Sequence, residues 1–182
     1  MHRFSTYYYI FDSRTGRPCI TERVASTTRS DRAQKALVRY VIDKKGEKVG
    51  RAFACWGAKQ TWHSSPFPES CIALWEAGRE QATAHETDTP LRSVRETYQE
   101  KALWATTVGL PAQDPAAAQL LAAWACTEPT VEAAIHDMMH MGGRWAEFVH
   151  SNDPDAAQAM EKRYQNALLD VLGSSTPLSL FS

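Results

Sequence analysis

Residues Thr130–His150 read TVEAAIHDMMHMGGRWAEFVH, and this stretch decides how the chain is organised. At about 100° per residue, its apolar side chains fall along one side of a helix. Four polar side chains fall along the opposite side, namely Glu132, His136, His140 and Glu147. One side of this helix therefore needs a hydrophobic core, and the other carries groups that serve chemistry or face water.

The pair Gly142-Gly143 lies in the interior of this helix. Two glycines cost about 2 kcal/mol relative to two alanines in a helix interior. Such a pair marks a kink, a break, or the close approach of another helix. We expect a kink, because the apolar stripe continues in phase through Trp145 and Val149.

Beyond residue 68 the chain repeats one sequence pattern that is typical of helix N-termini, a capping or acidic residue followed by proline. It occurs at Thr89-Pro90, Asp114-Pro115, Glu128-Pro129 and Asp153-Pro154, with Thr127 as the better cap of the third. Together with the apolar stripes, these starts indicate a bundle. The predicted helices span residues 68–87, 90–108, 114–126, 129–150 and 153–172.

The start of the chain has a different character. Phe4–Phe11 and Cys19–Ala25 are rich in aromatic and β-branched residues and are predicted to form a β-hairpin. A helix is predicted to begin at Ser30, and Val49–Trp56 is predicted to be a third strand. These elements make a ββαβ unit.

The predicted fold class is therefore α+β, with a helical majority. A basic α+β unit over residues 1–62 is followed by a linker at 63–68, where Pro66 and Pro68 interrupt regular structure. An acidic five-helix bundle follows over residues 69–182.

Charge is divided between these two parts. Residues 1–62 contain thirteen Lys and Arg against five Asp and Glu, a net charge of +8, and residues 63–182 carry a net charge of −9. The basic part predicts contact with nucleic acid or a partner protein, since cations bind phosphates and exposed aromatics stack on bases. The alternative is an internal interface with the acidic helices. The candidate contact residues are Arg14, Arg17, Arg23, Arg32, Lys35, Arg39, Lys44, Lys45, Tyr7 and Tyr9.

The cysteines and the apolar content indicate a cytoplasmic chain. The four cysteines lie far apart with no CxxC pair, as expected for free thiols in a reducing compartment. No run of about 18 apolar residues is present, and the first residues lack the aliphatic stretch of a signal peptide. We therefore expect no membrane contact.

His136 and His140 are candidate metal ligands, because i, i+4 spacing on a helix lets two imidazoles bind one ion. The segment AAIHDMMHMGG (residues 133–143) also resembles the central segment of the HD-domain metal phosphohydrolases. That resemblance implies that His136 and Asp137 bind a divalent metal ion. The family also needs an upstream His and a downstream Asp, for which His85 and Asp170 are available. The basic start of the chain is not part of that fold.

No catalytic motif of the sequence identifies an activity, and we expect a non-catalytic interaction protein with no cofactor. Its size and charge division suit an accessory factor or inhibitor that docks on a larger, nucleic-acid-handling protein complex. Small proteins of phages and plasmids, including inhibitors of host defence, commonly have these features. Two alternatives stay open: direct nucleic-acid binding by residues 1–62, and a divalent-metal phosphohydrolase that uses His136 and Asp137.

Overall fold

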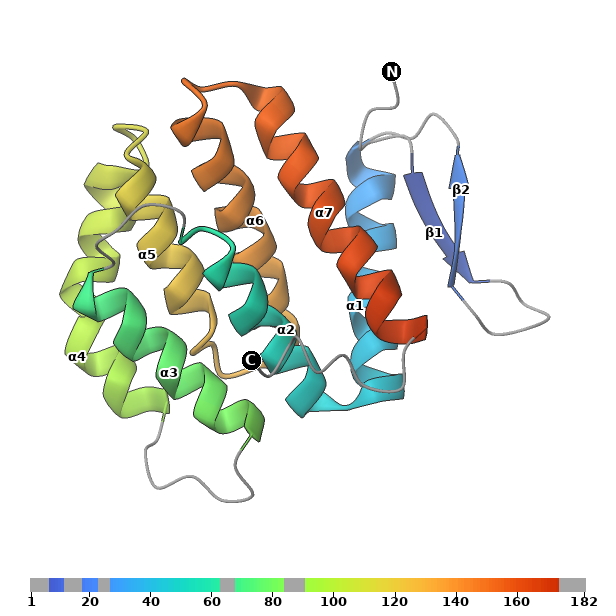
Figure 1. Cartoon of the computed structure of the whole chain (residues 1–182), viewed down its shortest axis with the longest axis horizontal. Helices are drawn as coiled ribbons and strands as arrows, with labels where there is room; N and C mark the ends of the chain where they lie inside the picture. Colours follow the sequence, from blue (N-terminus) through green and yellow to red (C-terminus); the bar gives the residue numbers. More distant parts are fainter. Residues whose placement is uncertain (1–6, 12–17, 23–26, 63–67, 84–90, 174–182) are drawn as a thin grey trace.

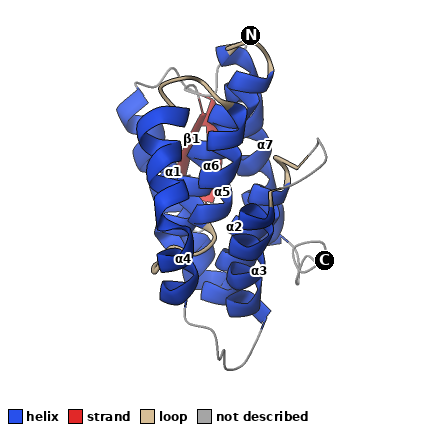
Figure 2. Ribbon diagram, turned by 90° about the vertical axis from the view of Figure 1, so that its left-hand side faces the viewer, coloured by secondary structure: helices blue, strands red, loops and turns tan. Residues whose placement is uncertain are grey.

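The computed structural model describes residues 7–11, 18–22, 27–62, 68–83 and 91–173, and these are almost entirely helical (Figure 2). No helix in this part of the chain combines the length and apolar character needed to span a membrane. The elements in chain order are β1 (Tyr7–Phe11), β2 (Pro18–Glu22), α1 (Thr27–Lys45), α2 (Glu47–Lys59), α3 (Glu69–Thr83), α4 (Leu91–Trp104), the π-helical segment η2 (Ala105–Gly109), α5 (Pro115–Ala125), α6 (Val131–Val149) and α7 (Pro154–Gly173).

The predicted α+β fold class is wrong, because the structure is a helical assembly. β1 and β2 pair as an antiparallel hairpin, with Tyr9 opposite Ile20. No other strand joins this hairpin within the described residues, so the ββαβ unit predicted over residues 1–62 does not form. Val49–Trp56, the predicted third strand, lies within helix α2.

Helix α2 forms where a strand was expected because its residues suit the centre of a helical core. It contacts α1, α3, α5 and α6 and is buried on nearly every side. A short apolar run that is buried all round has no periodicity to distinguish a strand from a helix, and its alanines favour the helix. Gly46, with φ of 91° and ψ of 164°, adopts a positive-φ conformation that glycine favours, and it separates the end of α1 from the start of α2.

The five helices predicted after residue 68 are all present within a few residues of their expected bounds. The Asp114 side chain caps α5 by accepting a hydrogen bond from the Ala116 backbone N–H at 2.9 Å. The cap of α6 is Thr130, which accepts from the Ala133 backbone N–H at 3.3 Å. Thr127, the predicted cap of this helix, lies before it and is buried.

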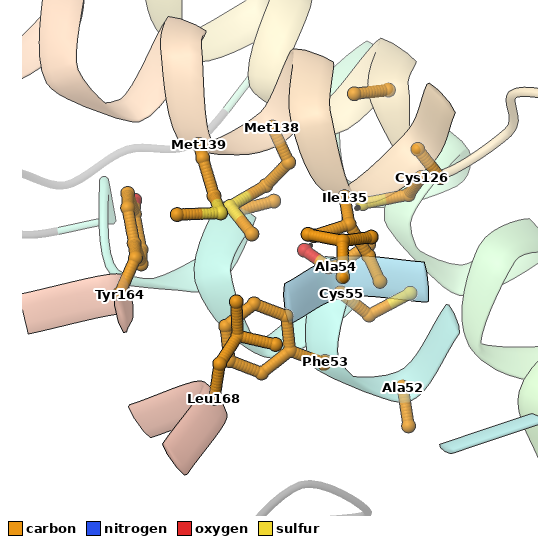
Figure 3. Packing of buried hydrophobic residues seen from close by; sticks show 14 of the residues in the cluster. Ala52, Phe53, Ala54, Cys55, Cys126, Ile135, Met138, Met139, Tyr164 and Leu168 are labelled. Atoms are coloured by element: carbon orange, nitrogen blue, oxygen red, sulfur yellow. Dashed lines mark hydrogen bonds between the residues drawn. The ribbon is translucent and has the colours of Figure 1, made fainter. Parts of the chain in front are cut away.

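Buried side chains of α1, α2, α3, α5, α6 and α7 form one core cluster, and a second, smaller cluster joins α3, α4 and α5. In Figure 1, α4, α5, α6 and α7 follow one another side by side, α1 lies beyond α7, and α2 and α3 pack across this row. Figure 3 shows Phe53 of α2 and Tyr164 of α7 in the same cluster as the buried side chains of α6. Helices from both predicted parts, residues 1–62 and 69–182, therefore contribute to one core. Residues 63–67 of the predicted linker lie outside the described residues.

The glycine pair of α6 serves a close approach between helices. Helix α6 continues through Gly142 and Gly143 to Val149. A Cβ atom on Gly142 would collide with the ring and hydroxyl of Tyr164, and one on Gly143 would come within 3.3 Å of the Glu161 side chain. The pair thus makes room for α7, and the kink that we expected is not needed to explain it.

Candidate interaction surfaces

The polar side of α6 lines a small pocket between α1, α6 and α7. Its volume is about 300 Å³, and His136 and His140 both line it, as their i, i+4 spacing predicts, together with Asp137. No three His, Cys, Asp or Glu side chains within the described ranges are grouped so that they could hold a metal ion. His85, which the phosphohydrolase resemblance would need, lies outside those ranges.

Asp137 occupies an environment that disfavours its charged form. Partial burial raises the pKa of its carboxyl above the ordinary value, and the nearby carboxylate of Glu128 raises it further. His140 and Arg95 act in the opposite direction. The pocket therefore holds a carboxyl whose pKa is raised although the Asp137 side chain is exposed, next to two imidazoles on the same helix.

The cationic and aromatic residues predicted to contact nucleic acid are only partly placed by the structure. Lys35, Arg39 and Lys44 are exposed on α1, and Lys45 is half-buried. Three more lie on α1 or β1 at positions where only the backbone is described: Arg32, Tyr7 and Tyr9. The remaining three lie outside the described residues: Arg14, Arg17 and Arg23.

Two arginines of the basic part form contacts with α6 or with the connection between α5 and α6. Arg51 on α2 is 6% exposed and donates hydrogen bonds to the carbonyl oxygens of Cys126 at 2.7 Å and Pro129 at 3.4 Å. Its burial lowers the pKa of the guanidinium. Arg39 pairs with Glu132 at 3.0 Å and joins α1 to α6. An internal role fits these two arginines, and binding of nucleic acid or a partner by the other cations stays a prediction.

Large apolar side chains are exposed at the end of α4 and in the segment that follows. Leu103 is 62% exposed, Trp104 44% and Val108 53%. We call these three residues the α4 patch. Within the described residues, the one other large apolar side chain with comparable exposure is Val149 on α6, at 45%. An exposed apolar cluster of this kind marks an interaction site more often than a scattered single residue does.

The π-helical turn Ala105–Gly109 helps to form the α4 patch. Its characteristic bond runs from the Leu110 backbone N–H to the Ala105 carbonyl oxygen at 2.8 Å. A π turn contains more residues than an α turn, so the chain rotates less per residue and Val108 stays on the side of Trp104. A Cβ atom on Gly109 would collide with Ala117, so this turn lies directly against α5. Single π turns in helices are frequent at functional sites.

The exposed α4 patch was not predicted from the sequence. The stripe predicted to face the core is half-buried or buried in the structure, and it consists of Leu91, Val94, Tyr98 and Ala102. The patch residues lie off this stripe. Large apolar residues outside the core stripe of an amphipathic helix were the available signal.

Comparisons with known proteins add no assignment to these surfaces. The sequence matches no protein-family model, and no similar curated protein or solved structure was found. The geometry and chemistry of the described residues are therefore the basis for a functional proposal.

Proposed function

We propose that the protein is a non-catalytic interaction protein that docks on another protein through the α4 patch. The observation that carries this proposal is the exposure of Leu103, Trp104 and Val108, which lie within residues 103–108 of the chain. Covering them removes apolar surface from water, which is the main favourable contribution to most protein association. Tryptophan is also enriched among the residues that dominate binding energy at interfaces.

The surroundings of the α4 patch suit an interface with an apolar centre and a polar rim. Arg92 and Glu96 form an exposed ion pair at 2.8 Å, about two to three turns before the patch. Glu100 and Lys101 are exposed immediately beside it. Charges of both signs at the rim help to select a partner and its orientation, while the apolar centre supplies affinity.

The broader role that we propose is that of an accessory factor or inhibitor of a nucleic-acid-handling complex, of the kind that phages and plasmids direct at host defence. This part of the proposal is supported by the small size of the chain and by the division of its charge into +8 and −9. Oppositely charged surfaces on one small protein suit association with a charged assembly.

Affinity capture from a lysate of the source organism tests the docking proposal. The unaltered chain is compared with Leu103→Glu and Val108→Glu, and Asn166→Glu at an exposed position on α7 is the matched control. We expect a specific protein to be retained by the unaltered chain and by Asn166→Glu, and to be lost with both patch variants. Circular dichroism confirms that the variants remain helical. Retention of the same proteins by all four chains, or of none, contradicts the proposal.

Direct nucleic-acid binding is the second candidate, and the exposure of Lys35 and Lys44 on α1 favours it. The same capture with and without nuclease, over a series of salt concentrations, separates it from protein docking, because phosphate contacts weaken steeply as salt rises. We expect the double variant Lys35→Glu/Lys44→Glu to reduce any nuclease-sensitive retention. The phosphohydrolase alternative stays a prediction: no three potential metal ligands are grouped within the described residues, and His85, which it would need, lies outside them.

A further inference from the structure

A second surface, separate from the α4 patch, lies along the seam between α6 and α7. It is a groove of about 570 Å³. We call it the α6–α7 groove, and its lining residues are Trp145, Ala146, Val149, His150, Ala156, Ala159, Met160 and Arg163. The two helices that form it are antiparallel neighbours in Figure 1.

The groove has an apolar floor and small side chains along its walls. Met160 and Ala146 are buried beneath it, Trp145 is half-buried, and Val149 is 45% exposed. Ala156 and Ala159 project only methyl groups on the α7 side, so a partner backbone can approach that helix closely. A groove of this shape accepts one or two large apolar side chains of a docked segment.

Arg163 sets the charge at the rim of the groove. Its Nη2 donates a hydrogen bond to the Gln60 side-chain oxygen at 2.6 Å, and the Gln60 amide nitrogen donates in turn to the Trp56 carbonyl oxygen at 3.2 Å. The guanidinium is therefore held in place by a neutral amide. Among the described residues, no carboxylate forms an ion pair with Arg163.

A positioned guanidinium beside an apolar groove is complementary to a carboxylate that adjoins a large apolar side chain. Arginine forms two parallel hydrogen bonds with a carboxylate, and such charge-assisted bonds are stronger than neutral ones. Because Gln60 already holds the side chain, little conformational entropy is lost when the carboxylate binds.

We propose that the α6–α7 groove binds a partner protein segment in which an Asp or Glu adjoins a large apolar residue. The apolar side chain enters the groove over Met160 and Trp145, and the carboxylate pairs with Arg163. This surface is independent of the α4 patch, so either proposal can fail without the other.

Selection from a random peptide library displayed on phage, with the full-length chain as bait, tests this proposal. We expect the selected peptides to share an acidic residue within one helical turn of a large apolar residue. In binding titrations with a selected peptide, Arg163→Glu should weaken the affinity by about tenfold or more, since a charge-assisted contact becomes a repulsion. Ala159→Trp, which fills the groove, should also abolish binding.

Lys162→Glu is the matched control, because it makes the same charge change at the neighbouring exposed position, which does not line the groove. It should leave the peptide affinity within a few-fold of the unaltered chain. Amide chemical shifts of Val149, Ala159 and Arg163 should move when the peptide is added. The proposal is overturned if no peptide is enriched, if the enriched peptides lack acidic residues, or if Arg163→Glu and Lys162→Glu have equal effects. Thermal unfolding confirms that each variant is folded, and Arg163→Gln repeats the test without a new charge.

Discussion

The hydroxyl of Tyr164 donates a hydrogen bond to the carbonyl oxygen of Gly57 at 2.9 Å, and this contact joins α7 to α2 in the centre of the core. Both residues are buried, and Tyr164 is inaccessible to solvent. Burial also raises the pKa of its phenol above the ordinary value, so the hydroxyl keeps its proton at all ordinary pH values. The neutral Tyr164 hydroxyl and the Gly57 carbonyl thus connect α7, the last helix, with α2.

Tyr164→Phe removes this hydrogen bond and leaves the Gly57 carbonyl without its phenolic donor. We expect the free energy of unfolding to fall by about 1–2 kcal/mol, the usual cost of a lost buried hydrogen bond. Urea denaturation measures the loss. Tyr98→Phe, at a half-buried position on α4, is the control and should change stability by less than about 0.5 kcal/mol. Equal effects would show that the Tyr164 hydroxyl has no special role.

The two glycines of α6 should respond differently to alanine. Gly142→Ala places a methyl group against the Tyr164 ring and should destabilise the fold by about 1–3 kcal/mol, as overpacking does. Gly143→Ala meets the flexible Glu161 side chain at 3.3 Å and the Ala157 carbonyl oxygen at 3.7 Å, an ordinary contact distance. Its effect should therefore lie between none and a gain of about 1 kcal/mol from helix propensity. Denaturant melts of both variants measure the difference. A kink at the pair would instead make the two substitutions similar.

Substitutions of Arg51 and Arg39 should also lower the free energy of unfolding by different amounts. Arg51→Met leaves the Cys126 and Pro129 carbonyls without their donor, and we expect a loss of about 2–3 kcal/mol in the free energy of unfolding. Arg39→Met breaks an ion pair whose arginine is 69% exposed, and should cost less than about 1 kcal/mol. Similar losses for both would contradict the assignment of Arg51 as the buried contact between α2 and the α5–α6 connection.

Asp137 should lower stability when it is ionised. Its folded-state pKa lies above the ordinary 3.8, so the folded state holds the proton more tightly than the unfolded chain does. The contribution of Asp137 to stability therefore falls as pH rises above 3.8 through the folded pKa, and stays unfavourable at higher pH. Asp137 is exposed, and solvent screens its interactions, so Asp137→Asn should raise the free energy of unfolding only slightly at neutral pH and lose this advantage in acid. Asp170→Asn at an exposed position on α7 is the control, and an equal gain there would contradict the prediction.

The buried thiols should be unreactive in the folded chain. Cys71 is inaccessible, and burial raises its pKa to about 11. The pKa of Cys126 is raised by a hydrogen bond with the Cys55 thiol and by complete burial. At mildly alkaline pH, a thiol reagent should leave both residues unmodified until denaturant is added, as peptide mass mapping would show. Rapid modification of either residue in the folded chain would contradict this burial.

The sequence predicted the second half of the fold well because its signals there are local. Asp114 before Pro115, and the apolar spacing of Val131, Ile135 and Met138, define helix starts and buried sides within a few residues of chain. It also placed His136 and His140 on one side of α6, where both line one pocket. These features follow from helix geometry alone.

Other features of the fold depend on contacts between residues that are far apart in the sequence. Val49–Trp56 became helical because α1, α3, α5 and α6 surround it, and an alternation of small and large residues does not reveal that surrounding. The role of Gly142 depends on Tyr164, which lies on another helix. The pairing of Arg39 with Glu132 shows how part of the charge division becomes an internal contact.

By itself, the sequence determined where the later helices begin and which sides of them are apolar, because capping, proline placement and helical periodicity act over a few residues. Only the tertiary structure decided that α2 is a helix, that helices from both parts of the chain share a core cluster, and that the α4 patch and the α6–α7 groove remain exposed. Burial depends on which helices lie next to one another, and the residues that set that arrangement are far apart along the chain.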